Sequence, residues 1–147
     1  MADKVIAGSD HAGRGLRAEA VRVARENGFE VDDLGPFSGE SVDYPDYARK
    51  VGEAVVAGRA RFGILVCGTG IGMSIAANKV KGVRAARCNT EYEARMARAH
   101  NDANVLCMGE RVLGFGQAGA VVVVFLSEPF EGGRHQRRVD KIGALER

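Results

Sequence analysis

Short apolar runs alternate along the chain with longer stretches in which apolar and polar residues mix. Each run is short enough to be a buried strand, and each ends at a glycine or a cluster of polar residues. The predicted strands cover residues 5–7, 29–34, 62–66, 83–87 and 103–108. The runs at 5–7, 62–66 and 103–108 are almost entirely apolar, which is typical of strands buried on both faces of a sheet.

The stretches between the runs carry apolar residues at helical spacing. In the first of them, Leu16, Ala20, Val21 and Ala24 form one stripe, and Asn27-Gly28 ends it. Similar stripes follow each of the other strands, and the last segment is basic and amphipathic. The predicted helices cover residues 16–26, 44–58, 73–80, 90–100, 113–127 and 134–146.

Strand and helix alternate five times, which indicates a parallel sheet with helices on both faces. The fold class expected is therefore α/β: a three-layer α/β/α, Rossmann-like arrangement with a five-stranded parallel sheet and an extra C-terminal helix. We expect residues 1–147 to form a single domain. In such sheets ligands bind beyond the carboxyl ends of the strands. The polar clusters at Asp10-His11, at residues 67–69 and after Met108 all follow a strand directly.

The composition excludes some classes of protein but does not indicate a function. Of the 147 residues 46% are apolar, and the net charge of +2 and pI near 8.5 are too mild to indicate a nucleic-acid or membrane partner. The longest apolar stretch, residues 118–126, is too short to cross a bilayer. No leader pattern is visible, and the number of cysteines, three, is odd. We therefore expect a cytoplasmic protein with reduced thiols.

The most informative stretch runs from residue 62 to 87, where a buried strand leads into a glycine loop and then a helix. Gly68, Gly70 and Gly72 alternate with other residues, a spacing typical of a tight turn whose N–H groups face an anion. A dinucleotide fingerprint would need glycine at Met73, and no Gly-Lys-Ser/Thr follows as in a P-loop. A purely structural turn remains an alternative.

Cys67 ends this strand, where a helix N-terminus would stabilise a thiolate. A reactive cysteine and a buried small apolar side chain are both compatible with that position. Cys88 and Cys107 lack this setting and are expected in the core.

Histidines and arginines offer two further interpretations. A metal could be held by a set of acids and histidines in predicted loops, although no pair has ligand spacing on one helix face. The members of that set are Asp10, His11, His100 and Asp102. In the last helix, Arg134 and Arg138 lie four residues apart and could grip a phosphate together, the alternative being a solvated basic face.

Four segments together resemble ribose-5-phosphate isomerase type B, the family that also includes galactose-6-phosphate and allose-6-phosphate isomerases. They occur in the family's order and extend nearly from end to end of the chain. The segments are GSDHAG at 8–13, CGTGIG at 67–72 with IAANK at 75–79, HNDAN at 100–104 and EGGRH at 131–135.

The resemblance implies an enzyme without metal or other cofactor that interconverts ribose 5-phosphate and ribulose 5-phosphate. It implies a homodimer or dimer of dimers, with sites shared between subunits. By similarity, Cys67 is the base that moves a proton between carbons 2 and 1, Thr69 stabilises the enediolate, and His100 helps to open the furanose ring. N–H groups of Gly68, Gly70 and Gly72 assist Thr69. The expected contacts are Asp10, Tyr44 and Asn101 to sugar hydroxyls, and His11, Arg111, Arg134 and Arg138 to the phosphate.

Two positions depart from the family pattern. Some members use a glutamate where this chain has Met73, which leaves Cys67 alone as the base, and Arg137 replaces a common glutamine. Three alternatives stay open: a six-carbon sugar phosphate as substrate, a Cys67–His100 pair acting as a covalent hydrolase dyad, and a sugar-phosphate sensor without catalysis.

Overall fold

Five parallel strands form one sheet in the order β2-β1-β3-β5-β4. The computed structural model describes residues 3–146. The strands are β1 (Lys4–Ser9), β2 (Glu30–Asp33), β3 (Phe62–Cys67), β4 (Ala85–Arg87) and β5 (Val105–Gly109). All neighbouring pairs are parallel, and β3 lies at the centre, where every residue is buried. This confirms the predicted sheet.

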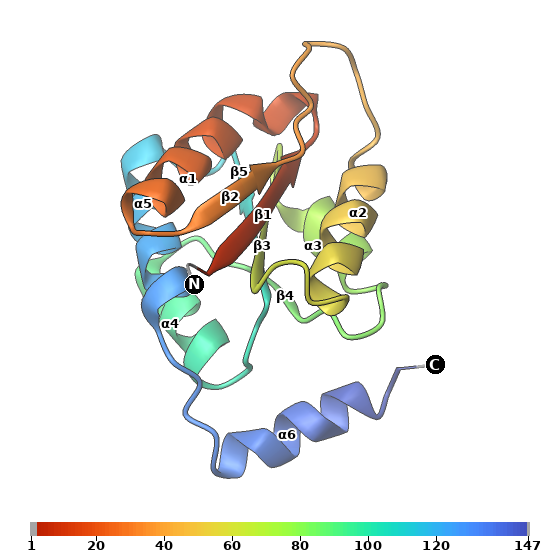
Figure 1. The fold of residues 1–147 in the computed structure, drawn as a ribbon, viewed down its shortest axis with the longest axis vertical. Coiled ribbons are helices and arrows are strands. Elements are labelled where there is room, and N and C mark those ends of the chain that lie inside the picture. The colour runs from red at the N-terminus through yellow and green to blue at the C-terminus, as the bar shows by residue number, and fades with distance from the viewer. Residues whose placement is uncertain (1–2, 147) are drawn as a thin grey trace.

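Helices cover both faces of the sheet, so the predicted three layers are confirmed (Figure 1). The helices are α1 (Arg14–Glu26), α2 (Tyr44–Val56), α3 (Ile71–Ala77), α4 (Glu91–Ala99), α5 (Phe115–Ser127) and α6 (Arg134–Gly143), with a 3₁₀ turn, η1, at His11–Gly13. Side chains alternate between the faces. Val5 and Ala7 of β1 pack in the cluster with α1, α4 and α5, whereas Ile6 packs with α2 and α3.

The third helix is shorter than the sequence pattern indicates, and β4 begins later. α3 ends at Ala77 because the side chain of Asn78 exchanges hydrogen bonds with the backbone N–H and C=O of Ala85. The N–H of Arg84 donates to the Asn104 side chain, which in turn donates to the Gly82 carbonyl. Side-chain amides therefore replace ladder hydrogen bonds here, a substitution that hydrophobic periodicity does not reveal.

The sixth helix lies outside the three layers, beyond the amino ends of the strands (Figure 1). Its attachments include a hydrogen bond from the N–H of Gly82 to the Glu146 carboxylate. Val139 is buried, but Ile142 and Leu145 are 42% and 80% exposed. Within residues 3–146, no helix is both long enough and apolar enough to cross a membrane.

Candidate functional site

The glycine loop directs one of its N–H groups at Cys67, the last residue of β3. Gly70 has a φ of +80°, a conformation that glycine adopts without the strain other residues meet. This turn aims the N–H of Gly70 at Sγ of Cys67, 3.1 Å away. The thiol is almost fully buried. The sulfur is therefore held at the start of the glycine loop, next to a backbone donor.

Backbone hydrogen bonds tie the loop after β5 to the glycine loop. The N–H of Glu110 donates to the Cys67 carbonyl, and the N–H of Arg111 donates to the Gly68 carbonyl, each at 3.0 Å. The Arg111 side chain lies over Gly68, so closely that a Cβ at that position would be 3.3 Å from Nη1. A guanidinium, a thiol and several N–H groups therefore share one end of the sheet.

The loop after β1 adds a carboxylate and an imidazole. The N–H of Asp10 donates to the Val66 carbonyl, which places this residue beside the end of β3. Its Oδ1 accepts from the N–H groups of Ala12 and Gly13, so it also caps the 3₁₀ turn. His11 Nδ1 accepts the N–H of Val42 at 3.2 Å, which draws the long loop after β2 toward the site.

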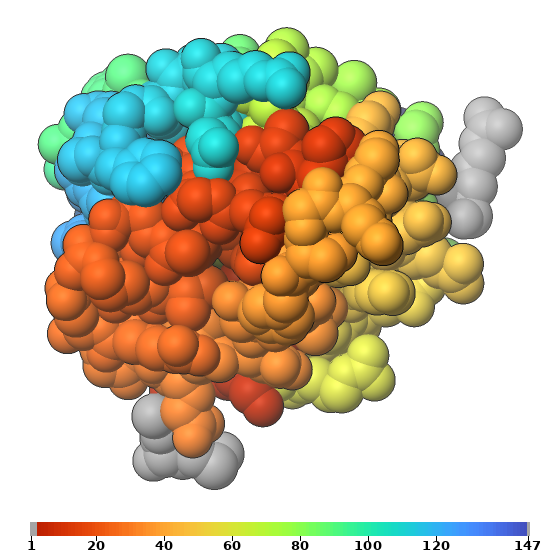
Figure 2. Space-filling model, turned by 90° about the horizontal axis from the view of Figure 1, so that it is seen from above, coloured from red at the N-terminus to blue at the C-terminus, as the bar shows by residue number. Residues whose placement is uncertain are grey.

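Tyr44, at the start of α2, packs directly on Gly72. A Cβ on Gly72 would lie 2.6 Å from the tyrosine ring, so only glycine allows this contact. A cleft of about 480 Å³ is lined by Asp10, His11 and residues 41–46, which include Tyr44. Figure 2 looks onto this end of the molecule: the red segment that follows β1 lies between the orange loop near residue 40 and the cyan loop near residue 110.

The remaining predicted site residues lie at the opposite end of the same chain. His100 and Asn101 follow α4 and precede β5, whereas Arg134 and Arg138 belong to α6. Cys67 pairs with Gly109 at the carboxyl end of β5, whereas His100 and Asn101 precede the amino end of that strand. The residues around Cys67 are therefore separated from those around His100 by the length of β5, about 13 Å. One chain therefore carries two half-sites, one at each end of its sheet.

Within a single chain, this separation excludes two of the site arrangements that the sequence left open. Within one chain, Cys67 and His100 cannot form a hydrolase dyad. The metal set considered from the sequence is also divided, because Asp10 and His11 lie at the carboxyl end and His100 and Asp102 at the amino end.

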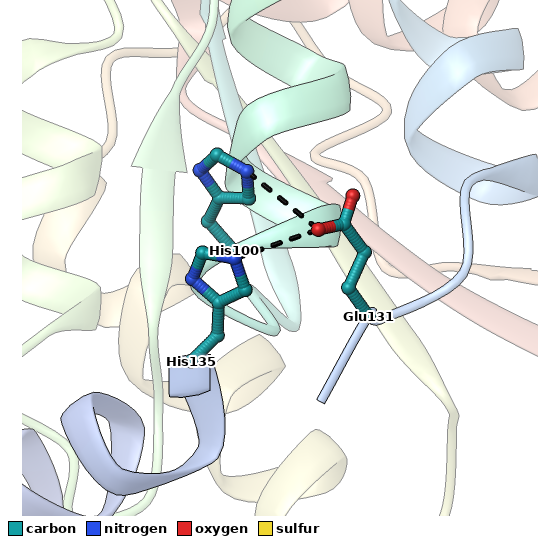
Figure 3. Close-up of side chains that lie close together, drawn as sticks. All are labelled: His100, Glu131 and His135. Carbon is teal, nitrogen blue, oxygen red and sulfur yellow. Dashed lines mark ion pairs between the residues drawn. The ribbon is translucent and has the colours of Figure 1, made fainter. Parts of the chain in front are cut away.

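His100 belongs to a different cluster, which sequence reasoning missed (Figure 3). Its ring stacks on the ring of His135, with centroids 4.1 Å apart and planes 12° from parallel. Oε1 of Glu131 lies 3.4 Å from Nε2 of His135 and 3.9 Å from Nε2 of His100. Burial lowers the pKa of His135, and the nearby His100 and Arg134 lower it further. His135 is therefore neutral at pH 7.

A second cavity lies away from Cys67. It has a volume of about 690 Å³ and lies between α6 and the segment around β4, lined by Asn78, Arg84, Asn101, Ile142 and Leu145 among others. Its lining mixes apolar side chains with charged and amide side chains, and Ile142 and Leu145 are exposed at its edge.

The other two cysteines are core residues, as the sequence predicts. Cys88 and Cys107 are 1% and 0% exposed, and all three cysteines are free. Burial raises the pKa of Cys88 to about 12, with a smaller contribution from Glu93, and burial also raises the pKa of Cys107. Both remain protonated at neutral pH, so neither is a competing base.

Residues that shape the site were not evident from the sequence. Arg17 is buried on α1, forms an ion pair with Asp33, and donates to Ser9 Oγ and the Pro36 carbonyl, which fixes the loop after β2. Glu110 accepts the N–H of Leu16 at 2.6 Å. Such contacts join residues that are distant in the sequence, so no local motif predicts them.

Gly109 is also required, for steric reasons, and replacing it should be costly. A Cβ there would lie 2.4 Å from the backbone of Thr69, so Gly109→Ala must push the glycine loop away. We expect the free energy of unfolding to fall by about 1–3 kcal/mol, with a loss of activity, measured by urea denaturation. Gly114→Ala is the control, because its Cβ would meet nothing within 4 Å. Wild-type stability in Gly109→Ala would refute this packing.

Comparisons with known proteins agree over almost the whole chain. A family model described as Ribose/Galactose Isomerase matches residues 5–142. Ribose-5-phosphate isomerase B of Escherichia coli is 49% identical over 97% of this chain and 96% of its own length. The putative sugar phosphate isomerase YwlF of Bacillus subtilis is 50% identical over 97% of both.

Solved structures agree equally well. The type B ribose 5-phosphate isomerase of Trypanosoma brucei superposes with a TM-score of 0.97 at 52% identity, covering 99% of this chain and 100% of the other. Ribose-5-phosphate isomerase B of Clostridium thermocellum gives a TM-score of 0.94 at 52% identity, covering 97% and 96%.

Proposed function

Because the chain belongs to the ribose/galactose isomerase family, we propose that it is an aldose–ketose isomerase that interconverts D-ribose 5-phosphate and D-ribulose 5-phosphate. The observation that carries this proposal is the hydrogen bond from the Gly70 N–H to Sγ of Cys67, which fixes the sulfur at the mouth of the glycine loop. Four of the relatives and structures described above carry names that specify ribose 5-phosphate or a sugar phosphate.

In the proposed mechanism, the Cys67 thiolate removes the proton from carbon 2 of the open-chain aldose. The electron pair forms an enediolate, whose oxygen charge is stabilised by the Thr69 hydroxyl and the loop N–H groups. The thiol then returns the proton to carbon 1 while the hydroxyl proton passes from the oxygen of carbon 2 to the oxygen of carbon 1, which gives the ketose and regenerates the thiolate. Well-placed oxyanion donors each contribute on the order of 3 kcal/mol to such a step. No metal or other cofactor takes part in this scheme.

The site is proposed to be shared between two copies of the chain. Cys67 and the cleft beside Tyr44 occupy the carboxyl end of the sheet, whereas His100 and Arg134 occupy the amino end, about 13 Å away. A two-fold dimer brings the carboxyl end of one copy to the amino end of the other, and does so twice. Each complete site then contains both half-sites.

Exposed apolar side chains support this assembly. Ile142 on α6 and Leu145 just after it are 42% and 80% exposed in one chain, and Ile71 and Ile75 on α3 are 47% and 58% exposed. Apolar surface of this kind is stabilised when a second copy buries it. A homodimer, or a dimer of dimers, follows as the proposed state.

The phosphate would be held from both copies. Arg134 and Arg138 lie one turn apart on α6 and present their guanidinium groups on one face. His11 and Arg111 come from the carboxyl end of the other copy. Asp10, Tyr44 and Asn101 are the proposed contacts to the sugar hydroxyls, and His100 the group that opens the furanose ring.

The choice of sugar follows from these fixed points. Cys67 and the phosphate arginines are on rigid elements, so the distance between base and phosphate selects the carbon chain length. We expect a higher kcat/KM for ribose 5-phosphate than for allose 6-phosphate or galactose 6-phosphate, measured in one coupled assay. A hexose phosphate with the higher kcat/KM would overturn the pentose assignment and leave the isomerase chemistry standing.

The same assay separates the other functions. A sensor without catalysis would give no turnover on any of the three sugars. A Cys67–His100 pair across the interface, acting as a hydrolase, would leave a covalent adduct visible by intact mass after quenching. The free thiols favour a reducing compartment, so we place this activity in the cytoplasm, in the non-oxidative branch of the pentose phosphate pathway.

A further inference from the structure

We propose that His100, Glu131 and His135 form a binding site for a zinc-type divalent cation, and that an ion bound there inhibits the enzyme by occupying His100. This inference rests on the proposed function only for its inhibitory part. The binding part rests on the three side chains, whose ligating atoms all lie within 4.8 Å of one another (Figure 3).

The donor set suits a borderline-soft ion. Imidazole nitrogen and carboxylate oxygen are the ligands of catalytic zinc sites with two histidines and one glutamate, and the fourth position stays open to solvent. Two donors on a tetrahedral zinc ion lie about 3.3 Å apart. The pair formed by Glu131 Oε1 and His135 Nε2, at 3.4 Å, already has this spacing. Both histidines turn Nε2 toward that same oxygen.

Backbone contacts hold the three residues in place before any ion binds. The N–H of Glu131 donates to the carbonyl of Ala99, which joins the segment before α6 to the end of α4 at 3.0 Å. His100 caps that end of α4, and the N–H of His135 donates to the Gly132 carbonyl in the first turn of α6. An ion therefore has to move only side chains.

The side chains differ in freedom. His135 is 8% exposed and fixed, whereas His100 is 36% exposed and the Glu131 side chain is 56% exposed. The stacked rings must open into a V for both Nε2 atoms to reach one ion, and His100 is the ring with room to turn. Ion binding therefore reorients His100, the group proposed to open the sugar ring.

Nearby charge sets the expected strength. The guanidinium groups of Arg134 and Arg138 belong to the same helix as His135 and oppose a cation at this place. We therefore expect binding weaker than at a closed structural zinc site, and reversible by a chelator.

Binding is tested first without any activity measurement. Co²⁺ is titrated into the metal-free protein and its visible absorption is followed, with Zn²⁺ competition giving the zinc affinity. Glu131→Gln and His135→Gln should each weaken binding by at least about 10-fold. Cys67→Ser and His11→Asn should bind as the wild type does. Binding that survives in Glu131→Gln and His135→Gln, or that is lost in Cys67→Ser, would overturn the proposed site.

Inhibition has its own signature. An enzyme that cannot open the ring depends on spontaneous opening in solution, so its rate on ribose 5-phosphate reaches a plateau as enzyme concentration rises. Zinc-loaded wild type should show this plateau, as His100→Asn should without metal, and a chelator should restore linearity. A linear rate with zinc bound would refute the inhibitory part. Absence of isomerase activity in the metal-free protein would instead refute the proposed function, and the cobalt titration would still stand.

Discussion

Replacing Cys67 by alanine should lower kcat by at least about 100-fold, the low end for the loss of a general base. Cys67 is the proposed acceptor of the substrate proton, and this chain has Met73 where the resemblance implies a glutamate in some family members. Phosphate binding should survive, because the side chains proposed to bind the phosphate belong to other elements. KM should therefore change little, and the loss should appear in kcat.

A matched control is available in the same sheet region. Cys88 is as buried as Cys67, but its pKa is raised to about 12, so Cys88→Ala should keep kcat near the wild-type value. Iodoacetamide should inactivate the wild type, with protection by substrate, and peptide mapping should find the label on Cys67. Near-normal turnover in Cys67→Ala would remove this residue from the mechanism.

Arg134→Ala should raise KM by about 10- to 150-fold, which corresponds to the loss of a charge-assisted hydrogen bond of 1.5–3 kcal/mol. The phosphate is bound similarly in the ground state and the transition state, so kcat should change little. Steady-state kinetics on ribose 5-phosphate separate the two constants. Arg49→Ala serves as control, because Arg49 is exposed on α2 and paired with Glu53. Unchanged kinetics in Arg134→Ala would exclude a phosphate clamp on α6.

The sequence was sufficient to predict the three layers and the glycine loop that follows Cys67. Apolar runs gave the five strands, and the glycines after Cys67 indicated the donor loop that the structure contains. Both signals are local: strand burial requires apolar residues at successive positions, and a tight turn requires glycine at Gly70. Features that depend on neighbouring residues in this way can be predicted from a single sequence.

The remaining features depend on contacts between distant segments. The Asn78 side chain ends α3 through its hydrogen bonds to Ala85, and Gly109 lets the backbone of Thr69 approach because it has no Cβ. The spacing of apolar residues predicts neither contact. The cluster of His100, Glu131 and His135 joins the end of α4 to the segment that leads into α6. Topology explains why the arginines of α6 lie far from Cys67: they follow a helix that returns to the amino ends of the strands.

Subunit complementation tests the shared site most directly. Cys67→Ala is damaged at the carboxyl end, and the double variant Arg134→Ala/Arg138→Ala at the amino end. The two are co-expressed with different tags, and the mixed dimer is assayed at substrate concentrations below the KM of the double variant.

If each site combines both ends, one site of the mixed dimer carries both defects and the other carries neither. The mixed dimer should then regain about half of the wild-type activity, because a two-fold dimer has two equivalent sites. Cys67→Ala paired with Thr69→Ala, both at the carboxyl end, should show no such recovery. A mixed dimer of Cys67→Ala with the double variant that is no more active than the average of its two parents would contradict a site shared between subunits.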